Sequence, residues 1–272
     1  AERQRMLDDH WKKWGPYVSN RQWGTVREDY SHNGNAWGHT TYNDAISRAY
    51  RWNEDGIAGI CDDKQLLCFA FSFWNRKDKM IKERFFGLSN YEGNHGEDIK
   101  ELFYYLDNTP THSYMKMVYK YPIASFPYEE LIAENAKRSK TEPEFELIDT
   151  GSLNDNNYFD LFIEYAKITH DDFAIRVTAV NRSHKKAPLV ILPTLWYRNN
   201  WSWGYGTYEP SLNSSAKGII NICHDSLPQK KFYSRHSNVE SLFCNNETNP
   251  AKINTHPSDH KFFKDGINDF IV

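Results

Sequence analysis

The sequence predicts a mainly β protein, an antiparallel β-sandwich with a few short helices. Several short strand-like runs follow one another with turn signals between them, whereas a βαβ protein would interpose regular helices. Hydrophobic residues make up 39% of the 272 residues and aromatic residues 15%, which is enough for a sizeable core. Sandwiches often exceed the usual length per domain, so we expect one large domain.

The N-terminal part differs in character from the rest of the chain. Within residues 4–14 the apolar side chains recur at helical spacing, and Gly15-Pro16 ends the pattern, which predicts a short helix. Residues 17–53 are rich in Gly, Asn, Asp and His without periodicity, which is typical of a long polar loop. We therefore expect residues 1–55 to pack as a helix and loop on a sandwich formed by residues 56–272.

The first half of the sandwich contains four expected strands and one helix. Residues 66–74 have the apolar run and polar flanks of a buried strand, and residues 82–88 and 98–106 are further candidates. Residues 111–121 alternate polar with apolar side chains, as a sheet with two unlike faces requires. Residues 128–138 place apolar side chains among Glu and Lys, which predicts a short exposed helix crossing between sheet edges.

The second half predicts a meander followed by weaker elements. We expect strands at residues 145–149, 157–167, 172–181 and 187–198, the third in strict period-two order. After residue 204 the pattern weakens, with a short apolar run at 218–222. A last strand is expected over residues 262–272. Because that run stops in mid-pattern, we expect the chain to be an excerpt from a longer polypeptide.

Charge and hydropathy exclude two classes of partner. The formal net charge is -3 and the lysines are scattered among acids, so nucleic acid is not expected. No window approaches the roughly 18 consecutive apolar residues of a membrane span, and the charged N-terminus has no apolar signal core. The sequence therefore predicts a soluble cytoplasmic protein without a membrane partner.

The cysteines predict neither a metal site nor a cofactor. Cys61, Cys68, Cys223 and Cys244 form no CxxC pair and no metal-ligand rhythm. Reduced thiols in a reducing compartment are favoured over two disulfides. We therefore expect no cofactor and no bound metal.

Three polar and aromatic stretches predict a binding site for a carbohydrate, because rings pack on the C–H faces of sugars while Arg, Asn and Asp bind hydroxyls. They are residues 23–30, 93–98 and 109–116. The predicted substrate-binding or pocket-lining residues are Trp23, Arg27, Glu28, Asp29, Tyr30, Trp37, Asn94, His95, Glu97, Asp98, Thr111, His112, Tyr114 and Lys116.

These residues leave the chemistry open. Two carboxylates that flank one glycosidic bond would permit hydrolysis, but neighbours such as Glu28 and Asp29 point to opposite faces of an extended chain. An acid from each of the first two stretches could still form a pair, and the alternative is a structural role in ordering the loops. The histidines have no third metal ligand at regular spacing, and no nucleophile elbow is present.

The aromatic run at residues 196–203 also has two interpretations. It contains three tryptophans together with an arginine and two asparagines. This composition is typical both of a packed strand end and of a stacking platform for sugars. The sequence does not decide between them.

The order of several motifs resembles the N-terminal part of large bacterial and fungal proteins grouped with glycoside hydrolase family 63, relatives of the α-glucosidases that trim mannosyl-oligosaccharides. The resemblance covers nearly the whole chain. Its motifs are WKKWGPY (11–17), RQWGTVREDYS (21–31), SRAYRWNEDGIAGI (47–60), NYEGNHGEDIKE (90–101), LDNTPTHSYMKMVYKYP (106–122) and LPTLWYRNNWSW (192–203).

The resemblance implies a division of labour between two domains. In that family a β-sandwich precedes a helical (α/α)6 toroid that carries the two catalytic carboxylates of an inverting hydrolysis. This chain resembles the sandwich only, so the resemblance implies no catalytic residue here, a carbohydrate ligand, and a C-terminal helical domain of the same polypeptide as partner. The alternatives are a stand-alone carbohydrate-binding module and a structural interaction domain.

Overall fold

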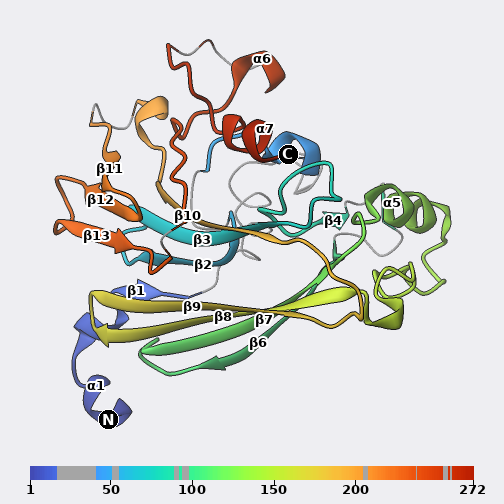
Figure 1. Cartoon of the computed structure of the whole chain (residues 1–272), viewed down its shortest axis with the longest axis horizontal. Helices are drawn as coiled ribbons and strands as arrows, with labels where there is room; N and C mark the ends of the chain where they lie inside the picture. The colour runs from blue at the N-terminus through green and yellow to red at the C-terminus, as the bar shows by residue number, and fades with distance from the viewer. Residues whose placement is uncertain are drawn as a thin grey trace.

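Two antiparallel sheets lie face to face in the computed structural model of the chain (Figure 1). The structure describes residues 1–16, 41–50, 55–88, 92–93, 98–204, 208–236, 238–253, 257 and 259–272. The expected mainly β fold with a sandwich-like arrangement of antiparallel sheets is confirmed, and the helices are few and short.

The upper sheet in Figure 1 has the strand order β1-β2-β3-β10 and the lower sheet the order β6-β7-β8-β9. The upper strands are β1 (Trp14–Gly15), β2 (Ile57–Asp62), β3 (Leu67–Trp74) and β10 (Val190–Tyr197). The lower strands are β6 (Leu102–Asn108), β7 (Tyr114–Pro122), β8 (Tyr158–Thr169) and β9 (Asp172–Asn181). Two smaller sheets are formed by β4 (Gly87–Leu88) with β5 (Asp98–Ile99), and by β11 (Ser211–Ala216), β12 (Ile219–Cys223) and β13 (Lys230–Tyr233).

The main core lies between the two large sheets. Because side chains alternate along a strand, every second residue of β3 points down and every second residue of β7 and β8 points up. The buried side chains that meet there include Phe69, Phe71, Phe73, Met115, Met117, Tyr119, Leu161, Ile163 and Tyr165. Polar contacts also join the layers: the Tyr165 hydroxyl donates to the carbonyl of Ala58 over 2.6 Å, and the Lys167 ammonium donates to the carbonyl of Trp14 over 3.0 Å.

The helices are α1 (Glu2–Arg5), η1 (Asp9–Lys12), α4 (Tyr42–Ala45), α5 (Tyr128–Lys137), η4 (Asn154–Asn156), η5 (Trp201–Trp203), α6 (Pro250–Ile253) and α7 (Gly266–Ile271). Across the described residues, no helix is both long and apolar enough to cross a bilayer. The expected continuous helix over residues 4–14 is wrong. The Asp8 carboxylate accepts from the backbone amide of His10 and starts a new turn there, because aspartate competes with the backbone as a cap.

The strands predicted at 66–74 and 172–181 are confirmed, whereas three other predictions are wrong. Residues 145–149 form a turn, and residues 262–272 form no strand but end in α7. The run 187–198 is a strand, but it pairs with β3 in the upper sheet instead of completing a meander beside β9. A strand pattern predicts the extended conformation, while the partner strand is chosen by long-range packing.

The helix expected at residues 128–138 is present as α5, but it is not simply exposed. Tyr128 and Leu131 are buried in a second core. In the sequence the helix lies between β7 and β8, so it connects two neighbouring strands of one sheet and does not cross between sheet edges. The strand predicted at 82–88 is present only at its two ends. Lys82 forms an isolated bridge with Phe73, and residues 87–88 form the short strand β4. The strand predicted over 98–106 divides into β5 and β6.

Candidate functional site

Most of the predicted sugar-binding residues lie outside the described part of the structure. These residues are Trp23, Arg27, Glu28, Asp29, Tyr30, Trp37, Asn94, His95 and Glu97. For Asp98 the structure describes the backbone, which pairs with Leu88 between β5 and β4. The sugar-binding role of this group therefore stays a prediction.

The described residues Thr111 and His112 belong to the turn between β6 and β7. His112 has a positive φ of 56°, and its ring lies 3.0 Å from the Asn108 side-chain oxygen. Thr111 is fully buried and donates its amide and hydroxyl to the Glu2 carboxylate, over 2.8 and 2.6 Å. Both residues therefore have a structural contact in the turn, and Thr111 fixes the N-terminal segment to it.

Tyr114 and Lys116 lie on the outer face of the lower sheet and converge on Glu164 of β8. The Tyr114 hydroxyl donates to Glu164 over 2.6 Å, and the Lys116 ammonium lies 3.9 Å away. Arg176 of β9 adds two further bonds to the same carboxylate, of 2.8 and 2.9 Å. The hydrogen bonds from Arg176 and Tyr114 lower the pKa of Glu164 to about 2.

We expect Glu164→Gln to lower the free energy of unfolding by about 1–2 kcal/mol at neutral pH, because hydrogen bonds to a charged group are lost. The folded pKa of Glu164 lies below its ordinary value of 4.5, so the stabilisation exists above about pH 4.5 and disappears as the pH falls towards 2. Chemical denaturation across this range checks the difference between the variant and the unmodified protein. A difference that stays constant down to pH 2 would contradict the assignment.

The structure separates the predicted residues into two groups. Asp98 lies in β5, which precedes β6, whereas Thr111 and His112 follow the far end of β6. The seven residues of β6 span roughly 20 Å at about 3.3 Å per residue. The described residues of the two groups therefore do not lie together.

What the structure does bring together is a cluster on the outer face of the upper sheet. The ring of Tyr50 contacts that of Trp196 at a tilt of 33°, with ring centroids 4.5 Å apart, and both residues are buried in one cluster with Cys61, Cys68 and Ala70. Tyr50 belongs to the sequence motif at 47–60 and Trp196 to the motif at 192–203. Neither was among the predicted site residues, because strand pairing across more than a hundred residues is not visible in local sequence.

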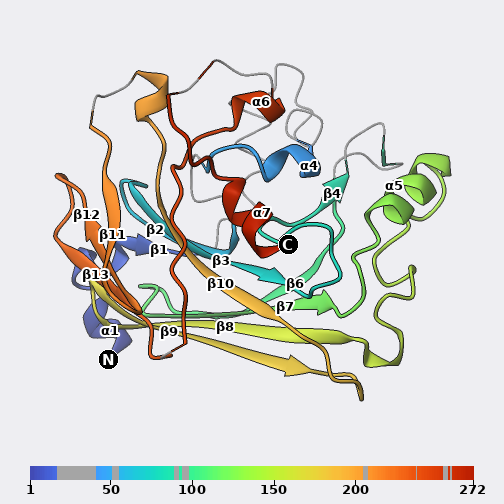
Figure 2. The same cartoon turned by 45° about the horizontal axis from the view of Figure 1, so that its top comes forward.

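The chain after β13 crosses this face, and the Asn246 side chain holds it there with hydrogen bonds. The side chain of Asn246 accepts from the Tyr50 amide over 2.7 Å and donates to the carbonyls of Tyr50 and Tyr197 over 2.6 and 3.0 Å. Asn199 donates to the Asn246 carbonyl over 2.5 Å. Figure 2 shows the C-terminal segment with α6 and α7 running over the upper sheet beside α4.

Charged groups are buried below α7. Glu83 accepts from the Tyr50 hydroxyl and the Lys264 ammonium, and burial raises the pKa of the Tyr50 phenol well above its ordinary value. Arg84 is also buried, and its Nη2 donates to Asp55 over 3.1 Å. The Nε and Nη1 atoms of Arg84 have no hydrogen-bond partner among the described residues.

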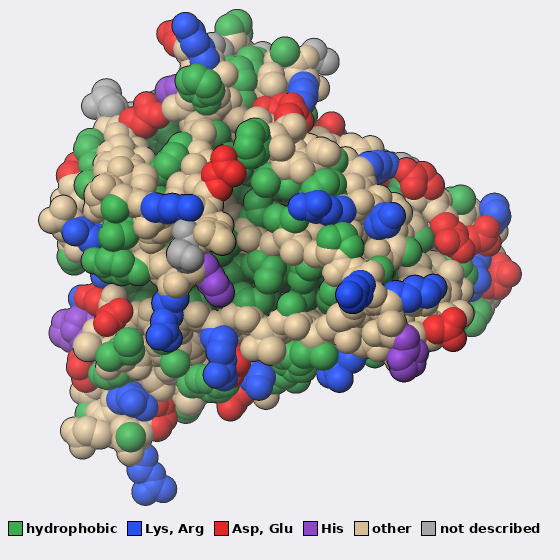
Figure 3. Space-filling model, viewed as in Figure 1, with side chains coloured by type: hydrophobic (Ala, Val, Ile, Leu, Met, Phe, Trp, Pro, Cys, Tyr) green, Lys and Arg blue, Asp and Glu red, His purple; other side chains and the backbone are tan. Residues whose placement is uncertain are grey.

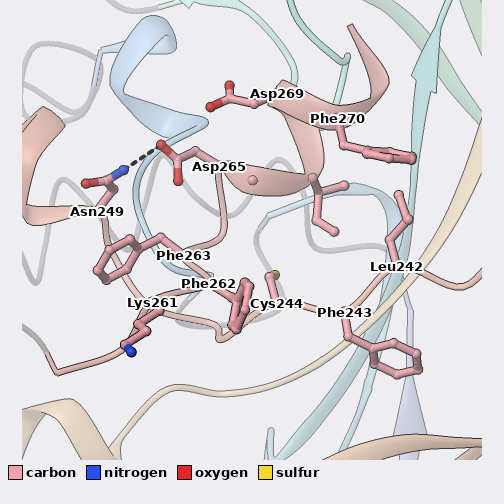
Figure 4. A pocket seen from close by; sticks show the side chains of 12 residues that line it. Leu242, Phe243, Cys244, Asn249, Lys261, Phe262, Phe263, Asp265, Asp269 and Phe270 are labelled. Carbon is pink, nitrogen blue, oxygen red and sulfur yellow. Dashed lines mark hydrogen bonds between the residues drawn. The ribbon is translucent and has the colours of Figure 1, made fainter.

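An apolar pocket of about 310 Å³ lies beside this cluster (Figure 4). Its walls come from the C-terminal segment and include four phenylalanines, together with the Cys244 thiol and Asp265. Phe243, Phe262 and Phe270 are 46%, 72% and 62% exposed, so the rim of the pocket is aromatic and open to solvent. The Asp265 carboxylate accepts a hydrogen bond from Asn249 over 2.9 Å and forms an ion pair with Lys252 at 2.8 Å.

A second apolar surface lies between the sheets. Figure 3 shows hydrophobic side chains gathered in a hollow between the upper and lower layers. The strands β9 and β10 form edges of the two sheets. Their inward side chains Ile175, Val177 and Leu195, and Leu189 just before β10, are only partly buried, although they pack against the main core.

The buried carboxylates of the described residues all accept hydrogen bonds from protein donors. They are Asp62, Asp78, Glu83, Glu101, Asp160, Glu164, Glu247 and Asp265. Within the same ranges, no group of three or more His, Cys, Asp or Glu residues could hold a metal ion.

Comparison with known proteins gives one long relative. No family model matches the chain, and no solved structure matches it. The chain is 40% identical, over an alignment 303 residues long, to the uncharacterized protein YMR196W of Saccharomyces cerevisiae. The alignment covers 98% of this chain and 28% of the yeast protein, so the chain spans less than a third of that relative's length.

Proposed function

We propose that the chain is the non-catalytic β-sandwich part of a larger exo-acting, inverting α-glycosidase similar to the α-glucosidases. In this role it supplies one wall of a sugar pocket and a packing surface for a helical catalytic domain. The observation that carries the proposal is the contrast between the buried carboxylates of the described residues, each of which accepts a hydrogen bond from the protein, and the open apolar surfaces. The resemblance of the sequence motifs to those of the glycosidase family and the greater length of the yeast relative also support it.

The hydrogen bonds that the buried carboxylates accept favour a structural role for this chain over a catalytic one. Inverting hydrolysis needs one carboxyl that protonates the leaving oxygen and another, about 6.5–9.5 Å away, that activates water. Glu83 is held by a tyrosine and a lysine, and Glu101 accepts from Lys82, from Tyr119 and from the amide of Phe86. Because these donors occupy their oxygens, such carboxylates are poorly placed to exchange protons with a substrate.

The apolar surfaces favour contact with a further folded unit. Solvent-exposed phenylalanines around a pocket, and a hollow between two sheet edges, mark interaction sites more often than isolated apolar residues do. The partner that fits is an apolar face of a neighbouring domain. Burying the Phe262 side chain, which is 72% exposed, would contribute about 1.5–3 kcal/mol to such packing.

A stand-alone carbohydrate-binding module is the second candidate, favoured by the outer face of the lower sheet. Tyr104 and Leu106 are 50% and 48% exposed there, and Phe162 lies in the register row of Tyr104. A flat sheet face with exposed rings suits stacking on an extended polysaccharide. Tyr104→Ala should abolish polysaccharide binding by the isolated chain if this candidate is correct, and should leave hydrolysis by a longer enzyme unchanged if the first is correct.

The main test compares the isolated chain with the polypeptide that contains its natural continuation. We expect purified residues 1–272 to show no hydrolysis of α-glucosides, because the catalytic groups are proposed to lie elsewhere. The longer polypeptide should hydrolyse them with inversion at the anomeric carbon, followed by NMR of the released sugar. Turnover by residues 1–272 alone would contradict the assignment.

A surface variant tests the packing role. We expect Phe262→Ser to leave the Tm of the isolated chain within about 1 °C, since the side chain is exposed, but to lower the Tm and kcat/KM of the longer enzyme. Leu7→Ser is the matched control, because Leu7 is 79% exposed in the N-terminal segment. Equal effects of both variants in the longer enzyme would argue against a specific docking surface at the pocket.

A further inference from the structure

One row of residues crosses the four strands of the upper sheet in register. Gly15 of β1 is opposite Cys61 of β2, Cys61 is opposite Cys68 of β3, and Cys68 is opposite Trp196 of β10. Cys61 and Cys68 are therefore direct cross-strand neighbours. Both are thiols in the structure, and they are 7% and 0% exposed.

The register places the two cysteines within the reach of a disulfide. Directly opposed residues of an antiparallel pair have Cα atoms about 4.5–5.5 Å apart. A disulfide joins cysteines whose Cα atoms are about 4.4–6.8 Å apart. Both side chains lie on the outer face, where they share one cluster with Tyr50, Ala70 and Trp196. The Cα spacing therefore allows the bond, which needs the Cβ atoms to approach from the roughly 4.5–5.5 Å of an opposed pair to about 3.5–4.5 Å.

The hairpin that carries the cysteines is held in this register. The Asp62 carboxylate accepts from the backbone amides of Lys64, Leu66 and Leu67, over 2.9, 2.9 and 2.6 Å. Asp62 follows Cys61 and Leu67 precedes Cys68, so these bonds act directly beside the cysteine pair. A fixed hairpin keeps the two sulfur atoms together and raises the effective concentration of one thiol for the other.

Cys61 is the more accessible thiol of the pair, since it is 7% exposed and Cys68 is 0% exposed. The residue beside Cys61 on β1 is Gly15, and a Cβ placed on Gly15 would meet nothing within 4 Å among the described residues. The remaining cysteines are different. Cys223 of β12 is opposite Ser211, and Cys244 is an exposed residue at the apolar pocket outside the described strands, so neither has a cysteine opposite it in a sheet.

We propose that Cys61 and Cys68 are an oxidation site, a dithiol that closes to a cross-strand disulfide by exchange with a low-molecular-weight disulfide such as glutathione disulfide. The Cys61 thiolate attacks one sulfur of the reagent and displaces glutathione thiolate, giving a mixed disulfide. The Cys68 thiolate then attacks the Cys61 sulfur and displaces the second glutathione. Two protein thiols are oxidised and one reagent disulfide is reduced to two thiols.

The disulfide would link β2 covalently to β3 within the cluster that contains Tyr50 and Trp196. It closes a loop of eight residues, so it restricts the unfolded chain modestly. We expect oxidation to raise the Tm by roughly 5 °C through this restriction. The site is independent of the proposed glycosidase role.

The experiment uses the unmodified chain equilibrated with glutathione disulfide, blocked with N-ethylmaleimide, denatured and digested with trypsin without reduction. Lys64 lies between the two cysteines, so trypsin separates residues 52–64 from residues 65–76 unless the disulfide joins them. We expect mass spectrometry to find these two peptides linked, together with the higher Tm. Reduction with dithiothreitol should release them and restore the lower Tm.

Single variants make the result specific. Cys68→Ser should remove the linked peptides and leave Cys61 as a stable mixed disulfide with glutathione, whereas the control Cys244→Ser should retain the link. Full labelling of Cys61 and Cys68 by N-ethylmaleimide after denaturation of the glutathione-treated, unmodified chain would overturn the proposal. A disulfide between any other pair of cysteines, without the 61–68 link, would also overturn it.

Discussion

Lys82→Met should lower the free energy of unfolding by about 4 kcal/mol, because removing one partner of a buried ion pair leaves an uncompensated charge. The side chains of Lys82 and Glu101 are both fully buried, and the ammonium lies 2.5 Å from the carboxylate. The ammonium also lies over the rings of Phe126, Tyr128 and Tyr42, at 3.8, 4.6 and 4.9 Å from their centroids. The substitution therefore removes both an ion pair and cation–π contacts.

The loss should depend on pH in a defined direction. Burial raises the pKa of the Glu101 carboxyl above its ordinary value of 4.5, even with Lys82 beside it, and without Lys82 the pKa rises further. A raised carboxyl pKa costs stability as the pH increases above 4.5. Urea denaturation should therefore show a larger deficit of the variant at pH 8 than at pH 5.

Two further variants separate charge from packing. Lys82→Met combined with Glu101→Gln should recover roughly half of the loss, because no buried charge remains. The amide oxygen can still accept from the Phe86 amide, and the NH2 group can donate to the Tyr119 hydroxyl. Lys79→Met is the exposed control, since Lys79 pairs with Glu129 at the surface, and it should cost less than about 1 kcal/mol. A deficit of the double variant as large as that of Lys82→Met would point to lost packing.

Gly56→Ala should destabilise the protein by about 3 kcal/mol, because the new methyl group overlaps the neighbouring strand and the backbone is left-handed there. A Cβ on Gly56 would lie 2.2 Å from the Cβ of Ala70 and 3.4 Å from the indole of Trp196. Gly56 has a φ of 86°, and Ala70 is fully buried in β3. The strands β2 and β3 must therefore move apart at this point.

The matched control is Gly266→Ala at the start of α7. A Cβ there meets nothing within 4 Å among the described residues, and the φ is not in the left-handed region. We expect the unfolding free energy to change by less than about 0.5 kcal/mol, since alanine favours a helix. Thermal denaturation of both variants makes the comparison, and similar Tm values would contradict the packing argument at Gly56.

Local patterns identified two strands of different kinds, one that alternates polar with apolar residues and one that is a continuous apolar run. Residues 172–181 alternate strictly and form β9 with the predicted ends, and residues 66–74 form β3 with one residue fewer. The pattern failed at residues 262–272, where apolar side chains line a pocket and a short helix rather than a sheet. Six helical residues contain too few turns to show a helical period against a strand-like composition.

The candidate site could be predicted only in part. The sequence motifs at 47–60 and 192–203 are polar and aromatic. In the structure they meet where the rings of Tyr50 and Trp196 are in contact. The buried pair of Lys82 and Glu101 gave no signal, because charged residues are usually exposed and only tertiary packing reveals their partners. The cysteine pair gave none either, since its spacing matches no known motif.

The sequence by itself determined the fold class of this protein, because strand periodicity and turn residues are local properties of the chain. Only the tertiary structure decided which strands pair, which acids are engaged and which apolar side chains remain exposed. The run 187–198 shows the reason, since it is strand-like in sequence but joins β3, more than a hundred residues away. Pairing of this kind depends on the burial of a whole sheet face, which no local window of sequence contains.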